Sequence, residues 1–166
     1  MSDFLEGVQD TPIESGSSNY LKLESGSTTL RLMGNPTQYY TVWGLQDGER
    51  QKHVSANQAE IESFATREDP VRLTWGLIVW NYAEGKLMAW ELTQKTIINQ
   101  IITLANAETS MLDRDFTIIK SGEKMQTKYQ VVPAAPSALE PAVAEANFAA
   151  NINKDGFITG DAIIEQ

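Results

Sequence analysis

The sequence predicts a mainly β protein whose body is one small closed barrel with one or two helices. Short runs of β-branched and aromatic residues alternate in polarity and are separated by Gly and Ser, which is the pattern of strands. Hydrophobic residues make up 42% of the 166 residues, enough to bury a core. We expect this body at residues 19–136, between an acidic arm at 1–18 and a Pro/Ala linker with an acidic tail at 137–166.

The strands are predicted one after another along the body. They are expected at residues 20–24, 30–32, 39–43, 73–80, 86–92, 116–120 and 128–132. Gly85 supplies a turn before the fifth of these, and Gly122 supplies one between the last two. Alternation along 73–80 puts Trp75 on the core face and Trp80 on the opposite face. Trp90 is also expected in the core.

Two helices interrupt the strands. Ser55 begins a capping-box spacing ahead of a helix that is predicted to end near Ala65. Thr93 is placed to cap a second helix, whose apolar residues recur on one face. If residues 20–24 and 30–32 are counted as one interrupted run, there are five or six strands with a helix before the last hairpin. This count fits an OB-type Greek-key barrel, while an SH3-like barrel or a sandwich would also fit.

The negative charge is unevenly distributed. The whole chain has a net charge of -9, which by itself argues against binding to nucleic acid. However, residues 1–18 and residues 137–166 each have a net charge of -4, so the body has only -1. The body also contains all four Trp and all five Tyr. The acidic ends are expected either to aid solubility or to bind partners and screen the body.

Composition argues against several classes of protein. There is no Cys and only one His, His53, so Cys-based or His-rich metal sites are not expected. No phosphate-binding loop or nucleophile elbow is present. We therefore expect no enzyme activity, no cofactor and no metal. The start of the chain has no signal-peptide pattern, and no apolar run reaches the length of a membrane span. A cytoplasmic protein with no membrane partner is expected.

Aromatic and basic residues are interleaved along the body. Tyr39, Tyr40 and Trp43 share one predicted strand, and Trp80 and Tyr82 lie at the end of another. Single-stranded nucleic acid is held by flat side chains that stack on bases, within a basic groove that follows the phosphates. Each of these aromatic residues, taken alone, is as well explained by a place in the core. The set as a whole favours a single-stranded DNA site.

Four stretches of the body occur in a distinctive order. They are residues 20–26 with 30–32, residues 75–82 with 85–86, residues 91–97, and residues 115–122 with 127–133. In this order and spacing the body resembles the phage-type single-stranded DNA-binding protein family, which has an OB fold. Such proteins coat single strands without sequence preference during phage replication, recombination and repair.

The resemblance implies where DNA would lie and where partners would bind. The implied DNA-binding residues are Arg31, Trp80, Tyr82, Lys86, Lys120 and Lys128, to which Tyr39, Tyr40 and Trp43 are added by their chemistry. Some relatives hold a structural zinc, which this chain has no Cys to bind. Many such proteins also end in an acidic tail that recruits replication or recombination proteins and competes with DNA. The expected partner-binding residues of the tail are Asp155, Phe157, Asp161, Ile163, Ile164 and Glu165.

Residues 151–162 partly follow the pattern of a calcium loop. Oxygen-bearing side chains fall at the first, third and fifth positions, and Gly156 falls at the sixth. The twelfth position is Ala162, where a bidentate carboxylate should close the coordination shell. These departures favour a turn over a calcium site.

Three functions remain as hypotheses. The leading one is single-stranded DNA binding by a phage protein, located in the host cytoplasm. The second is a protein–protein or virion-associated module that uses the same barrel without DNA, because a fold does not fix a function. The third is an enzyme such as a nuclease, which the missing metal-ligand cluster argues against.

Overall fold

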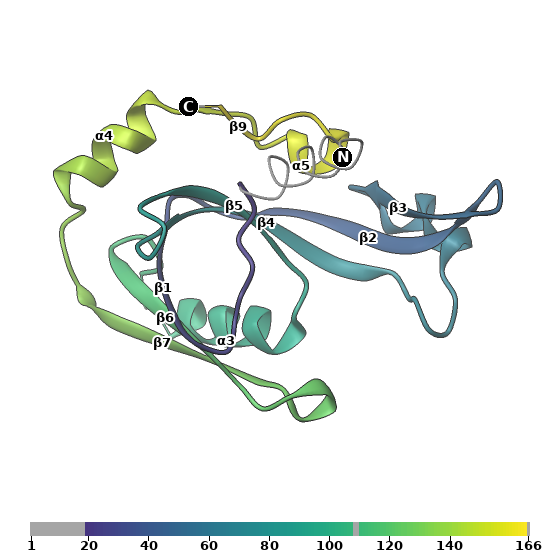
Figure 1. Cartoon of the computed structure of the whole chain (residues 1–166), viewed down its shortest axis with the longest axis horizontal. Coiled ribbons are helices and arrows are strands. Elements are labelled where there is room, and N and C mark those ends of the chain that lie inside the picture. The colour runs from purple at the N-terminus through teal and green to yellow at the C-terminus, as the bar shows by residue number, and fades with distance from the viewer. Residues whose placement is uncertain (1–18, 108–109, 166) are drawn as a thin grey trace, which may run out of the picture.

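The computed structural model describes residues 19–107 and 110–165, and its main element is one curved antiparallel sheet of seven strands (Figure 1). The strands are β1 (Gly26–Leu32), β2 (Thr37–Gln46), β3 (Glu49–Ser55), β4 (Arg72–Asn81), β5 (Lys86–Leu92), β6 (Arg114–Ser121) and β7 (Lys128–Pro136). The helices are α3 (Lys95–Asn106), α4 (Pro141–Ala149) and α5 (Gly156–Thr159), with 3-10 turns η1 (Gln58–Glu60), η2 (Glu62–Phe64) and η3 (Lys124–Gln126). A two-stranded ribbon pairs β8 (Asn151–Ile152) with β9 (Ile164–Glu165). The prediction of a mainly β protein is confirmed.

Strand β4 organises the sheet. The strand order is β3-β2-β4-β1-β6-β7, and β5 also pairs with β4. One edge of β4 pairs with β5 along 75–81. Its other edge pairs first with β2, along 72–76, and then with β1, along 79–81. Strands β1 and β2 therefore pair with the same edge of β4. The β2–β3 hairpin extends beyond β4 as a separate arm.

Among the described residues the sheet does not close, so the expectation of a closed barrel is wrong. Closure would require β7 to pair with β5, but other groups occupy both edges. On β5, Leu21 N donates to the Ala89 carbonyl at 2.8 Å beside a short parallel bridge. On β7, the Gln100 side chain of α3 donates to the Tyr129 carbonyl at 2.9 Å and accepts from Val131 N at 2.8 Å.

Three local predictions need correction. Residues 20–24 form one bridge with β5 and are otherwise irregular. The helix expected up to Ala65 is instead two 3-10 turns, which are separated at Ile61 and capped by Asn57. The second helix begins at Lys95 with Gln94 as its N-cap residue, so Thr93 does not cap it. Its predicted apolar face is confirmed, because Ile97, Ile98 and Ile101 are buried.

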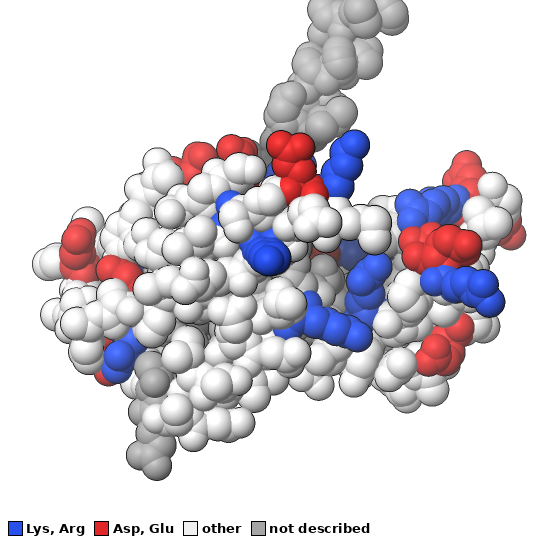
Figure 2. All heavy atoms as spheres, turned by 90° about the horizontal axis from the view of Figure 1, so that it is seen from below, with Lys and Arg blue, Asp and Glu red and all other residues white. Residues whose placement is uncertain are grey.

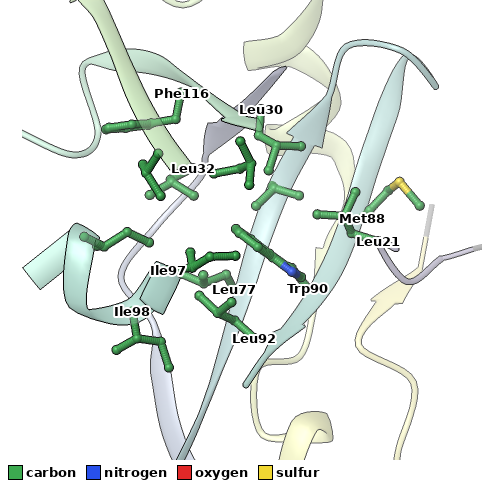
Figure 3. Close-up of a cluster of buried hydrophobic side chains, with 14 residues drawn as sticks. Leu21, Leu30, Leu32, Leu77, Met88, Trp90, Leu92, Ile97, Ile98 and Phe116 are labelled. Carbon is green, nitrogen blue, oxygen red and sulfur yellow. The ribbon is translucent and has the colours of Figure 1, made fainter. Parts of the chain in front are cut away.

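The inner core lies between α3 and the concave side of the sheet (Figure 3). Its buried members are Leu21, Leu30, Leu32, Leu77, Val79, Met88, Trp90, Leu92, Ile97, Ile98, Ile101, Phe116, Ile118 and Val131. Trp90 is buried here, as predicted, and Trp75 packs against the cluster while partly exposed. The expected alternation along β4 is therefore correct at Trp75, Leu77 and Val79.

A second core lies on the opposite, outer side of β4 and β5. It joins Tyr39, Ile78, Leu87 and Ala89 of the sheet to Phe157, Ile163 and Ile164 of the C-terminal segment. Figure 1 shows this segment lying across the side of β4 and β5 that faces away from α3. Burial on both faces explains the unbroken apolar runs in these two strands, which alternation alone does not produce. In the described part of the chain, no helix is long and apolar enough to cross a membrane.

Candidate nucleic-acid interface

The β2–β3 hairpin forms an arm that is packed on one side and open on the other. Asp47 and Gly48 make its two-residue turn, and both have positive φ, 55° and 82°. On the packed side, the His53 ring stacks on Phe64 with 3.6 Å between centroids. Gly44 allows the Phe64 backbone to approach closely, because a β-carbon at this position would collide with it. The turns η1 and η2 thus pack against the side of the arm that carries His53 and Gly44.

Trp43 lies on the open side of the arm. Its side chain is 46% exposed, and the Arg50 guanidinium lies 5.2 Å from the ring centroid. Arg50 is also paired with Asp69, at 2.8 Å between Nη2 and Oδ1. A cation over an indole ring is attracted to the face of the ring. The exposed part of Trp43 is therefore an aromatic surface, in contact with a guanidinium, that can stack on a base.

A hollow of about 230 Å³ lies next to Trp43. It is lined by Thr41, Val42, Trp43, Lys52, Asp69, Pro70, Arg72, Glu91 and Thr93. Lys52 is paired with Glu91. Arg72 is exposed at the start of β4 and forms no ion pair with another described residue. The hollow thus places an unpaired guanidinium and a lysine beside an exposed indole.

A second basic region, which we call the lysine face, surrounds the β6–β7 hairpin. It consists of Lys95, Lys120, Lys124 and Lys128. Figure 2 views the molecule from the side of β7 and η3, and blue spheres gather over the middle of this side while most red ones lie nearer its edges. Lys120 Nζ donates to the Leu23 carbonyl at 3.4 Å. None of the four lysines forms an ion pair within the described ranges.

Arg31 and Tyr82 are bonded to neighbours on the outer side of the sheet. Arg31 is 4% exposed, lies 3.3 Å from Asp115 and donates to the Ser137 hydroxyl and carbonyl oxygens at 3.1 and 2.9 Å. Tyr82 donates to Asp115 at 2.8 Å. Burial, followed by this hydrogen bond, raises the pKa of Tyr82 to about 12. Arg31 therefore anchors the start of the C-terminal segment and is not part of the exposed surface.

Tyr39 is fully buried beneath the C-terminal segment. Its hydroxyl donates to Glu91 Oε2 at 2.6 Å, and its ring stacks on Phe157 at 6.0 Å between centroids. Burial and then the hydrogen bond to Glu91 hold the pKa of the Tyr39 hydroxyl well above its usual value. Trp80 is half-buried against the same outer core. Tyr39 and Trp80 are thus close together but largely covered.

The remaining predicted DNA-binding residues lie in separate places. Tyr40 is half-buried on the side of β2 that faces away from Trp43, as strand alternation requires. Lys86 is half-buried where β5 begins. Lys120 and Lys128 belong to the lysine face. Of the nine predicted residues, three therefore lie at the arm or the lysine face and four are held on the outer side of the sheet, while Tyr40 and Lys86 belong to neither group.

The predicted tail residues also divide into two groups. Phe157, Ile163 and Ile164 are buried in the outer core. The three acidic ones, Asp155, Asp161 and Glu165, are exposed. Within the calcium-like stretch the backbone turns into α5, and no group of three possible metal ligands is found in the described residues. The acidic arm at 1–18 lies outside the described residues.

Sequence reasoning missed two features of the site. Strand β3 and its Arg50 were not predicted, although the Asp47–Gly48 turn is a strong hairpin signal. An apolar pocket of about 290 Å³ was also missed, and it lies between β4 and the end of α3 beside Trp75, Ile102 and Leu112. Its residues come from three distant parts of the chain, so no local pattern marks it.

Comparisons with known protein families, with curated proteins and with solved structures find no match.

Proposed function

We propose that this protein binds single-stranded DNA without sequence preference, along the arm and the lysine face. The observation that carries the proposal is Trp43, an exposed indole held under Arg50 beside Lys52 and Arg72. Base stacking on an aromatic side chain contributes about 1–3 kcal/mol and is tolerant of sequence, because every base has a flat face. The Arg72 guanidinium next to it forms no ion pair with another described residue and is suited to a phosphate beside the stacked base.

The order of strands supports an open form of the OB topology. Taken in chain order, β1, β4, β5, β6 and β7 are five strands with α3 between the third and the fourth, and β1 pairs with both β4 and β6. OB proteins bind oligonucleotides on their second and third strands and on the loops after the first and fourth strands. In this chain those loops correspond to the arm and to the η3 turn, which carry Trp43 and Lys124.

The lysine face supports the same proposal through electrostatics. Lysines that neutralise phosphates release the counterions condensed on the DNA, so the affinity for DNA falls as salt rises. The body as a whole has a net charge of -1, and this charge does not prevent a local basic surface. Coating of single strands is the role we propose, as in the phage-type family that the sequence resembles, in replication, recombination or repair.

The C-terminal segment is proposed to limit access to part of this site. It covers Tyr39 of β2 and packs against Trp80 of β4. It also carries the exposed carboxylates Asp155, Asp161 and Glu165. Release of the segment would expose aromatic surface and remove negative charge at the same time. Recruitment of replication or recombination proteins is a further role proposed for the exposed carboxylates.

The test compares substitutions in the exposed set with a matched aromatic control. Trp43→Ala should weaken binding of a fluorescent oligo(dT) by about tenfold or more, because a stacking contact is lost. Arg72→Ala should weaken it less and should reduce its salt dependence. Phe148→Ala removes an aromatic side chain that is 91% exposed on α4 and should leave the affinity unchanged. Equal affinities for all four proteins would refute the proposed site.

The apolar pocket favours a second candidate, which is a protein-binding module without DNA. Ile102 is 39% exposed and Leu112 is 46% exposed at the pocket, more than such side chains usually are in a core. Under this alternative, the oligonucleotide has no effect on the protein, and Ile102→Asp abolishes a complex with a protein partner. Binding of oligo(dT) that depends on Trp43 favours the first candidate.

A further inference from the structure

Part of the C-terminal segment packs into a hollow on the outer side of the sheet. We call the packed residues of the segment the plug and the residues of the sheet that receive them the socket. The socket is formed by Tyr39, Gly76, Ile78, Leu87 and Ala89, and the plug is formed by Phe157, Ile163 and Ile164. A β-carbon at residue 76 would lie 2.5 Å from the Phe157 ring, so only glycine admits the ring at this depth. Tyr39 stacks on the other part of the ring. The contact is therefore specific in shape as well as apolar.

The plug has hydrogen bonds of its own. Strands β8 and β9 pair with each other, and Asn153 N donates to the Ile163 carbonyl at 2.7 Å. Between them α5 ends at Gly160, whose φ of 88° suits a glycine. These bonds lie within the segment, so they do not depend on which copy supplies the socket.

The chain between the body and the plug, which includes α4 and which we call the connector, has few buried groups. In α4 the buried side chain is Val143, and Phe148 is 91% exposed near the end of the helix. Few buried side chains therefore hold the connector to the body.

We propose that the socket also accepts the plug of a second copy of this chain, so that two copies exchange their C-terminal segments. Any contact between two segments of one chain can be made equally between two identical chains, which is the basis of domain swapping. The intramolecular contact dominates at low concentration, because the connector keeps the plug at a high effective concentration. This inference does not depend on DNA binding.

The proposal is tested by mixing two full-length variants that each have only half of the contact. Gly76→Val blocks the socket and keeps the plug. Phe157→Asp replaces the aromatic ring of the plug with a charge and leaves the socket unchanged. Neither variant has both an open socket and an intact plug, so each variant alone should stay a monomer. Their equimolar mixture should form a one-to-one heterodimer by light scattering, with Phe157→Asp supplying the socket and Gly76→Val supplying the plug.

A peptide measurement keeps the test valid if either variant folds poorly by circular dichroism. A fluorescent peptide of residues 150–165 should bind Phe157→Asp, or the milder Phe157→Ala, at least tenfold more tightly than it binds Gly76→Ala. A mixture that stays monomeric up to the solubility limit would overturn the exchange, and so would a peptide that binds both variants equally. Heterodimer formation, with the matching peptide preference, would support it.

Discussion

Gly76 is the residue on which the outer core depends most. A methyl group there would meet the Phe157 ring at 2.5 Å, and the ring is also stacked on Tyr39 at 6.0 Å between centroids. Overpacking of this kind usually costs about 1–3 kcal/mol. We expect Gly76→Ala to lower the free energy of unfolding in urea by that amount.

The cost should come from Phe157 and not from the strand itself. In a Phe157→Ala background the ring is gone, so the further change of Gly76→Ala should cost little or nothing. The interaction energy from this double-mutant cycle is therefore expected to be about as large as the single effect. Additive effects would show that Phe157 does not occupy this position.

Tyr82 predicts how stability depends on pH. Its pKa in the folded chain is raised to about 12 from the usual 10, because it is buried and donates to Asp115. A raised pKa means that the folded chain keeps the proton longer, so this contribution is fully present below pH 10 and is lost between about pH 10 and 12. Tyr82→Phe should flatten the fall of the unfolding free energy in that range. An equally steep fall in the variant would contradict this.

At the residue scale, strand alternation predicted which side chains share a face, but not which face is covered. Trp75 and Trp80 lie on opposite faces of β4, as expected. Arg31 was expected near DNA from the family resemblance, and Tyr39 was expected there because of its chemistry. Their burial depends on Ser137 and Phe157, which are more than a hundred residues away in the sequence. No local pattern contains that information.

At the scale of elements, Gln100 takes the place of a sheet partner for β7. Its amide oxygen accepts from Val131 N, and its amide nitrogen donates to the Tyr129 carbonyl. These two bonds satisfy backbone groups that a neighbouring strand would satisfy in a closed barrel. The helix is therefore a structural part of the sheet edge.

Removal of the Gln100 amide should leave two backbone groups of β7 unpaired. Gln100→Leu is expected to lower the free energy of unfolding by about 1–3 kcal/mol. It should also speed hydrogen exchange at the Val131 amide. Asn99→Leu changes an exposed neighbour on the same helix and should have little effect on either measurement. Equal effects of the two substitutions would argue against this role of Gln100.

The elements differed in how well the sequence predicted them. Strands β4 and β5 and helix α3 were predicted within a few residues, because each has a strong apolar pattern. Strand β3 is mostly polar and was missed, although Asp47–Gly48 indicates a hairpin. Residues 20–24 have a strand-like pattern but form a single bridge with β5.

At the scale of the whole molecule, the C-terminal segment is part of the fold. Part of the chain's negative charge is thereby held close to the sheet, with Asp155, Asp161 and Glu165 on the outside of the docked plug. The expectation of an acidic tail after residue 137 did not foresee this, because the apolar residues of the segment have no strand or helix period that marks a face for packing on the sheet. Only the three-dimensional structure shows that these apolar residues pack against the same part of the sheet.

Release of the segment should therefore change both stability and DNA affinity. Phe157→Asp is expected to lower the unfolding free energy, because it places a charge in an apolar socket. It is also expected to tighten binding of oligo(dT), since Tyr39 and Trp80 become accessible, even though the variant has one more negative charge. Ile102→Asp adds the same charge on α3, away from the plug, and should not tighten binding. Equal or weaker binding by Phe157→Asp would contradict the screening role.

The central claim is that the arm and the lysine face bind single-stranded DNA. The most direct measurement is the fluorescence anisotropy of labelled oligo(dT), titrated with the full-length chain at several salt concentrations. We predict saturable binding at low salt, with the logarithm of the association constant falling linearly as the logarithm of salt concentration rises. No binding at the lowest salt, by either the full-length chain or its Phe157→Asp variant, would contradict the claim.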